Sequence, residues 1–115
     1  MTIKRGDLFL VNFNPGRGSE QAGYRPAVVI QNNVGNRHGS TTIIAAIAAI
    51  TTSINKIYPF MVRLHKGEVG LDQESAVNLA QILTLDKDRL DKKLGYLSDE
   101  RMTEVDKAIR LSLGL

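Results

Sequence analysis

Short apolar runs rich in β-branched residues alternate along this chain with segments rich in glycine, proline and asparagine. Such runs are typical of β-strands, and the segments between them are typical of turns. A single amphipathic segment follows at the end of the chain. We therefore expect a mostly β (α+β) fold, a compact antiparallel sheet or barrel closed by a C-terminal helix. The predicted strands are residues 7–13, 26–31, 60–64 and 75–85, the last as one or two strands.

The C-terminal helix has the clearest boundary signals. Ser98 is a favourable N-cap, and Asp99 and Glu100 follow where the helix dipole favours negative charge. The apolar residues then recur every three or four positions, which predicts one buried face. These residues are Met102, Val105, Ile109 and Leu113.

Four segments are less regular. Residues 14–23 hold three glycines and a proline and predict a long mobile loop, and residues 36–40 predict a polar turn. Residues 42–52 fit either a strand, by their isoleucines and threonines, or a buried helix, by their alanines. Residues 86–94 have a helical composition that ends at Gly95.

Length and composition indicate one domain, residues 1–115. The chain has no cysteine, which excludes disulfides and thiolate metal sites. Its N-terminus lacks the apolar core of a signal peptide, and no apolar run is long enough to span a bilayer. We expect a soluble, cytoplasmic protein that does not bind a membrane.

The positive charge is concentrated at one end. Residues 1–40 hold five basic and two acidic residues, whereas residues 41–115 hold ten of each, so the whole excess of +3 lies in the first third. A local basic surface favours a polyanion such as nucleic acid. Solubility alone is the other interpretation.

Several common chemistries lack their residues. There is no P-loop motif, and neither His38 nor His65 has metal-ligand spacing around it. Asp86, Asp88 and Asp91 are better explained as a solvated helix face than as a calcium loop. We predict no metal site and no cofactor.

One segment carries a specific motif, Gly-Ser-Glu-Gln-Ala-Gly-Tyr-Arg-Pro at residues 18–26. With it go Lys-Arg-Gly-Asp at 4–7, Gly-Asn-Arg at 35–37, Ile-Thr-Thr-Ser-Ile-Asn-Lys at 50–56, Gln-Ile-Leu-Thr-Leu-Asp-Lys at 81–87 and Leu-Ser-Asp-Glu at 97–100. Together these strings resemble the MazF/PemK (Kid-like) toxins of type II toxin–antitoxin systems. The resemblance covers almost the full chain.

This resemblance implies an SH3-like antiparallel β-barrel with short helices and a C-terminal helix. It implies a homodimeric toxin endoribonuclease that cleaves single-stranded RNA (mRNA) at a short sequence, without a metal ion. It further implies attack by the RNA 2′-hydroxyl, which leaves a 2′,3′-cyclic phosphate and a 5′-hydroxyl. The implied partner, besides RNA, is a cognate antitoxin with an acidic C-terminal tail.

The resemblance marks Arg25 as a catalytic residue. A guanidinium can hold a phosphate through two hydrogen bonds, and Pro26 restricts the backbone directly after it. We expect electrostatic stabilisation by Arg25 more than proton transfer, because its pKa is too high for an efficient acid–base group. His38 is an alternative base, although an exposed loop histidine is the simpler interpretation.

The family's catalytic threonine has three candidate positions here. Counting forward from residues 35–37 places it at Ala48, which has no hydroxyl. Counting back from residues 53–56 places it at Thr51, with Thr52 as the second choice. The Thr51 alignment requires three extra residues, either within 36–42 or in a bulge, because an odd insertion in a strand would reverse its faces. We take Thr51 as catalytic.

Further residues are expected at the RNA. Glu20 and Gln21 should either shape the loop over the RNA or hydrogen-bond a base or Arg25. Tyr24 or Phe60 could stack on a base, although both also fit as packing residues. Leu83 stands where the family commonly has a basic residue, which puts that contact in doubt. The predicted RNA-binding residues are Arg17, Glu20, Gln21, Tyr24, Thr52 and Gln81.

Two other functions remain open. A toxin class of the same fold binds DNA gyrase without catalysis, but its representatives carry a C-terminal tryptophan, and this chain has none. If Ala48 occupies the threonine position, the chain would be a catalytically dead RNA-binding module or an SH3-like adaptor.

Overall fold

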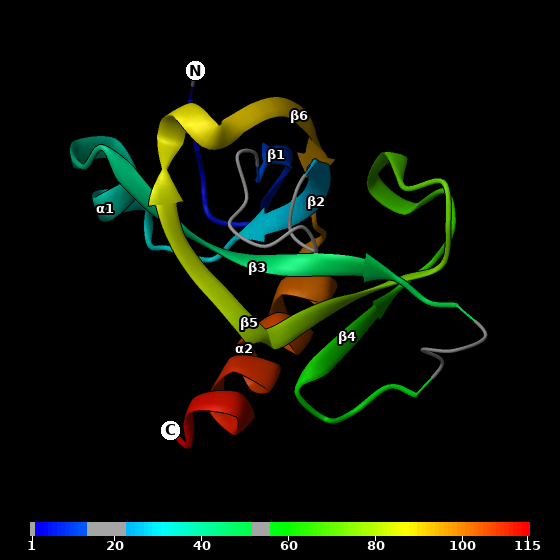
Figure 1. Cartoon of the computed structure of the whole chain (residues 1–115). Coiled ribbons are helices and arrows are strands. Elements are labelled where there is room, and N and C mark those ends of the chain that lie inside the picture. The colour runs from blue at the N-terminus through cyan, green and yellow to red at the C-terminus, as the bar shows by residue number, and fades with distance from the viewer. Residues whose placement is uncertain (1, 14–22, 52–55) are drawn as a thin grey trace.

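The computed structural model describes residues 2–13, 23–51 and 56–115, and its main feature is one six-stranded antiparallel sheet (Figure 1). The strand order across the sheet is β4-β5-β3-β2-β1-β6. The strands are β1 (Asp7–Asn12), β2 (Tyr24–Val29), β3 (Thr41–Ala49), β4 (Met61–Leu64), β5 (Ser75–Asp86) and β6 (Leu90–Tyr96). The helices are α1 (Asn33–His38), α2 (Asp99–Leu113) and the 3-10 turns η2 (Glu68–Gly70) and η3 (Lys87–Arg89).

The predicted mostly β fold with short helices and a C-terminal helix is confirmed. The closed barrel is not: in the described part of the chain β4 and β6 are the two edges of the sheet, and no pairing joins them. The sheet curls because β5 is long and sharply bent (Figure 1). Both halves of β5 pair with β3, and its first half, residues 75–78, also pairs with β4.

The two faces of the sheet bury two separate groups of apolar side chains, because successive residues of a strand point to opposite faces. The first face packs against α2; its strand residues include Leu8, Val28, Ile47, Val62 and Val77. The second face has its own cluster, formed by Ile3, Phe9, Val11, Ala27, Val29, Ile44 and Leu90.

Helix α2 begins and packs as predicted over most of its length. The Ser98 hydroxyl accepts a hydrogen bond from the Arg101 backbone nitrogen at 3.2 Å, and Val105 is fully buried. Met102 and Ile109 pack against the same core, but Leu113 is 58 % exposed and lies outside it. No helix in the described residues is long and apolar enough to cross a membrane.

The segment that fitted either a strand or a helix is the central strand β3. It pairs with β2 on one side and with β5 on the other. Ile44 and Ile47 therefore lie in the clusters on opposite faces, whereas a helix would place them on one side.

Two predicted segments are wrong. Residues 36–40 are not only a turn, because the short helix α1 occupies Asn33–His38 and is capped by the Asn32 side chain. Residues 86–94 are not an α-helix: they are the last residue of β5, the 3-10 turn η3 and most of β6. Pairing with the exposed edge of β1 overrides the helical preference of this lysine-rich segment.

Strand β5 contains an irregularity that matters for the site. Ala45 pairs with Ile82 but the next residue, Ala46, pairs with Asn78, so residues 79–81 form a bulge. The bulge is held from two sides. The Leu79 nitrogen donates to the Phe60 carbonyl at 3.0 Å, and the Ser112 hydroxyl of α2 donates to the Leu79 carbonyl at 2.6 Å.

Candidate functional site

Arg25 lies near the start of β2, where its side chain is exposed. It pairs with Val11 of β1, and Tyr24 pairs with Asn12 beside it. Val11 is buried on the second face of the sheet, so Arg25, as its direct partner, belongs to that same face at the rim of the cluster. The strand thus fixes the backbone of Arg25, whereas the residue as a whole is exposed.

Ala48 is the residue of β3 closest in register to Arg25. The pairing of β2 with β3 ends at Ala27 and Ala46, and the same register continued by two residues on each strand would place Arg25 opposite Ala48. The beginning of β2 and the end of β3 lie on the same side of the molecule (Figure 1). Ala48 is exposed and also pairs with Ala76 of β5. Small side chains therefore occupy the two strands next to Arg25.

Thr51 lies two residues beyond the end of β3 and is exposed. The preceding residue, Ile50, donates its backbone N–H to the Glu74 carbonyl at 2.8 Å, which ties this end of β3 to the start of β5. Three residues of extended chain span at most about 10 Å. Thr51 is thus within this distance of the Ala48 position opposite Arg25.

The bulge in the β3–β5 ladder lies in β5, at residues 79–81, and β3 itself contributes no additional residue to it. It is therefore not the bulge that the Thr51 alignment requires, and that alignment stays a prediction. The β2–β3 pairs from Ala27 to Val29 run without a shift. Residues 36–42 hold the end of α1 and the start of β3.

Four predicted site residues, Arg17, Glu20, Gln21 and Thr52, lie outside the described residues. Of the others, Tyr24 is 52 % exposed and Gln81 is exposed within the β5 bulge. Phe60 stacks on Tyr58 with ring centroids 5.3 Å apart, and Leu83 is 41 % exposed. His38 is exposed at the end of α1.

A cavity of about 150 Å³ lies beside the Ala48 position. Two side-chain amides, Asn78 and Gln81, line it together with Lys56. Its remaining walls are Ala48, Ala49, Ile50, Ile57, Met61 and Ala76. The cavity therefore joins apolar walls to a few hydrogen-bonding groups, which is the usual composition of a ligand site.

Lys56 and Tyr58 add a cationic and aromatic element next to this cavity. The Lys56 ammonium lies 5.1 Å from the Tyr58 ring centroid, and Tyr58 is 42 % exposed. A lysine on a stack of two rings suits contact with a nucleic acid, because bases stack on aromatic faces and phosphates attract cations. Sequence reasoning missed Lys56, Tyr58 and Asn78. The polar Asn78 between the apolar Val77 and Leu79 was the available signal.

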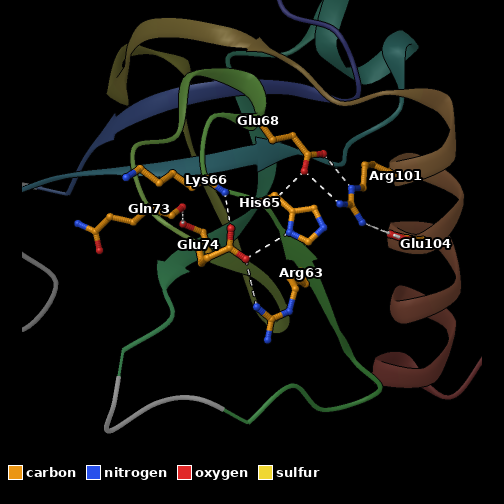
Figure 2. Close-up of polar contacts among 9 residues, drawn as sticks. Arg63, His65, Lys66, Glu68, Gln73, Glu74, Arg101 and Glu104 are labelled. Carbon is orange, nitrogen blue, oxygen red and sulfur yellow. Dashed lines mark hydrogen bonds and ion pairs between the residues drawn. The ribbon is translucent and has the colours of Figure 1, made fainter.

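A network of charged side chains fixes the β4–β5 connection near the end of β3 (Figure 2). The Glu74 carboxylate accepts from the Lys66 backbone nitrogen at 2.5 Å and lies 3.2 Å from both Arg63 and His65. The hydrogen bond from the Lys66 backbone nitrogen, followed by the contact with the His65 side chain, lowers the pKa of Glu74. These contacts support the turn that receives the Ile50 hydrogen bond.

The second part of this network anchors the turn to α2 (Figure 2). Arg101 donates to both oxygens of Glu68 and also bonds Glu104. The hydrogen bonds from Arg101 lower the pKa of Glu68, and they raise that of Arg101 in turn. Within the described residues, no group of three or more His, Cys, Asp or Glu side chains could hold a metal ion.

Known proteins resemble the chain over nearly its whole length. A family model for the PemK-like, MazF-like toxin of type II toxin–antitoxin systems matches residues 4–113. The Endoribonuclease MazF of Staphylococcus saprophyticus is 50 % identical over 114 residues, which cover 98 % of this chain and 92 % of that protein.

Solved structures share the fold. MazF from Deinococcus radiodurans has a TM-score of 0.77 at 26 % identity and covers 100 % of this chain and 99 % of its own. A mycobacterial endoribonuclease, solved in complex with its cognate antitoxin, has a TM-score of 0.79 at 23 % identity, with 97 % of this chain and 95 % of that chain covered.

Proposed function

The chain belongs to the PemK-like, MazF-like toxin family and is a toxin endoribonuclease, and we propose that it cleaves single-stranded RNA at a short sequence without a metal ion. In this proposal the RNA's own 2′-hydroxyl attacks the adjacent phosphorus. The products are a 2′,3′-cyclic phosphate and a 5′-hydroxyl. Because the nucleophile is part of the substrate, the reaction needs no metal-bound water.

The observation that carries this proposal is the place of Arg25. Its backbone is fixed in β2 by pairing with Val11 of β1, and the residue is exposed. A cavity with two amides lies beside Ala48, the position that the β2–β3 register, continued, would place opposite it. The attacked phosphoryl group gains negative charge as the reaction proceeds. A preorganised guanidinium stabilises that charge, so Arg25 is assigned the electrostatic role.

Thr51 supplies the second donor in this proposal, with Thr52 as the second choice. Its hydroxyl follows the end of β3, within reach of the Ala48 position, and would hydrogen-bond a phosphoryl oxygen. We propose that groups of the RNA and solvent carry out the proton transfers at the two ends of the reaction.

The remaining proposed contacts are with RNA. Tyr24, which is half exposed beside Arg25, stacks on a base, and Gln81 hydrogen-bonds one. Arg17, Glu20 and Gln21 are further proposed RNA contacts, on the resemblance of their motif alone. We further propose a homodimer with RNA across the subunit junction, acting in the cytoplasm on mRNA.

A cognate antitoxin with an acidic tail is the proposed regulator. Two features support it: the basic excess in residues 1–40 and the antitoxin complex of the mycobacterial endoribonuclease of the same fold. An acidic segment over Arg25 would block the place of the RNA phosphates.

One experiment tests the chemistry. The purified protein is incubated with a long RNA in EDTA, and the ends of the fragments are mapped. We expect cleavage at a recurring short sequence, with cyclic-phosphate and 5′-hydroxyl ends. Loss of cleavage on chelation, or 5′-phosphate ends, would contradict the mechanism.

A further inference from the structure

We propose that the cavity beside Ala48 receives one unpaired base of the RNA, and that Asn78 selects a base whose facing edge carries a carbonyl oxygen. This inference rests on the proposed RNA cleavage and adds to it a specificity-determining residue. It depends on three features: the small side chains that open the cavity, the fixed orientation of the Asn78 amide, and the cationic and aromatic surroundings.

The cavity exists because small residues face each other on two strands. Ala48 pairs with Ala76, so their side chains lie next to each other on the same face of the sheet. Asn78 follows two residues along β5 on that face and pairs with Met61 of β4. A larger side chain at Ala48 or Ala76 would fill this space. The cavity is smaller than a drug-sized ligand requires, and a single planar ring suits it.

The Asn78 amide is held in one orientation by the β5 bulge. Its Oδ1 accepts a hydrogen bond from the Ala80 backbone nitrogen at 2.9 Å. Only the oxygen of an amide can accept, so this contact assigns the Nδ2 group to the remaining side of the side chain. Among the described residues, Nδ2 makes no hydrogen bond. Asn78 therefore offers the cavity a hydrogen-bond donor.

The orientation is rigid because the bulge itself is held. The Leu79 backbone nitrogen bonds the Phe60 carbonyl, and the Leu79 carbonyl accepts from Ser112 of α2. Both contacts act on the residue directly after Asn78. A donor fixed in this way distinguishes ligands better than a side chain that can rotate, because the wrong ligand leaves it unpaired.

An unpaired base is the ligand that fits these groups. Its ring would lie between the apolar walls formed by Ile50, Ile57 and Met61, and its edge would meet the Asn78 donor. Proteins that read single-stranded RNA recognise splayed bases by such edge contacts. Lys56 at the same cavity attracts the backbone phosphates. Uracil and guanine carry the required carbonyl, whereas cytosine and adenine carry an exocyclic amine on the corresponding edge.

The variant Asn78→Asp isolates this donor. The aspartate keeps an oxygen that can accept from the Ala80 nitrogen, but it replaces the amide nitrogen by a second acceptor. The added negative charge would weaken RNA binding by itself, so Gln73→Glu is the matched control. Gln73 is an exposed amide outside the cavity, and its variant adds the same charge. Thermal unfolding of all three proteins verifies that the variants are folded.

The readout is the binding of short 2′-O-methyl oligonucleotides that cannot be cleaved, together with cleavage of an RNA pool with randomised positions. We expect wild type and Gln73→Glu to prefer uracil or guanine at one position of the site. In Asn78→Asp that preference should fall by about tenfold and shift toward cytosine or adenine, because one directed base contact is worth that order of discrimination.

The outcomes separate this inference from the proposed function. If wild type does not cleave RNA but the oligonucleotide preference shifts in Asn78→Asp, the proposed function fails and the base site stands. If RNA is cleaved and the preference is the same in all three proteins, the base site is overturned. If Asn78→Asp changes only the binding of an acidic antitoxin peptide, the cavity belongs to that partner and the base site is likewise overturned.

Discussion

Arg101 of α2 holds the carboxylate of Glu68 at both oxygens, with Nε and Nη2 at 2.8 and 3.1 Å. Neither side chain is more than a quarter exposed, at 19 % and 24 %. The pair joins the C-terminal helix to the connection between β4 and β5. Glu74 lies at the β5 end of this connection, where its carboxylate accepts from the Lys66 backbone nitrogen. The support for the end of β3 therefore extends through this turn to α2.

The first prediction follows from the lowered pKa of Glu68. A lowered pKa means that the folded state favours the carboxylate, so the stabilisation is complete at neutral pH. This stabilisation begins to decrease when the pH falls below 4.5, the ordinary pKa of a glutamate, and it is lost once the pH drops through the lowered pKa of Glu68. Glu68→Gln should lower the free energy of unfolding by about 1 kcal/mol at pH 7.

Urea unfolding at pH 7 and in acid checks this expectation. Glu68→Gln should approach wild type as the pH falls below 4.5, whereas Asp72→Asn, an exposed carboxylate in the same connection, should match wild type throughout. An equal loss at both pH values would mean that the effect of Glu68 is steric rather than electrostatic.

The second prediction concerns the proposed dimer. Leu111, Leu113 and Leu115 are 58 %, 58 % and 83 % exposed at the end of α2, an unusual concentration of leucine at a surface. Leu113→Lys should raise the dimer dissociation constant about tenfold or more, since a buried leucine contributes about 1.5–3 kcal/mol.

Sedimentation measures the change. Val34→Lys, at a position on α1 that is 61 % exposed, is the control and should remain a dimer. Wild type that is monomeric at micromolar concentration and fully active would refute the dimer itself.

Much of this fold could be predicted from local sequence, and the exceptions share one physical reason. Strands 7–12 and 61–64 and helix 99–113 have their own patterns. By contrast, the sequence of β6 predicts a helix, because its lysines and aspartate give no alternating strand pattern. It forms a strand only because the edge of β1 is available for pairing. Periodicity within one segment cannot report a partner that lies about ninety residues away, as in the pair Asp7 and Tyr96.

The candidate site likewise combines a residue that the sequence predicts with relationships that only the fold creates. Arg25 was predicted because its motif is contiguous in sequence. That Ala48 stands opposite it, and that Asn78 shares a cavity with Gln81, depend on strand register and on the bulge at residues 79–81. No short window of sequence contains those relationships.

The third prediction concerns charge at the cavity. The affinity for single-stranded RNA should fall as salt rises, because bound cations release counterions from the phosphates. Lys56→Ala should reduce the slope of log affinity against log salt by about 0.7, the value of one phosphate contact on a single strand.

The control is Lys107→Ala, an exposed lysine on α2 that lies beside the groove between α2 and β4. It should leave the slope unchanged. Equal slopes for wild type and Lys56→Ala would remove Lys56 from the RNA surface.

The last prediction tests the two proposed catalytic residues. Arg25→Ala should lower the cleavage rate by about 10²–10³-fold, because Arg25 stabilises charge that develops only in the transition state. Thr51→Ala should cost less, since a hydroxyl donates a neutral hydrogen bond. Both residues are exposed, so neither change should alter thermal unfolding, and single-turnover rates on a fixed RNA measure the loss.

Ala48 provides the decisive comparison, because it stands in register with Arg25 but has no hydroxyl. If Thr51 supplies the donor, Ala48→Thr should not raise the rate, and it would instead narrow the cavity shared with Asn78. A fully active Thr51→Ala variant would show that the hydroxyl comes from Thr52 or from no threonine. If Ala48→Thr activated a silent protein, the threonine position would be 48, and the natural chain would bind RNA without cutting it.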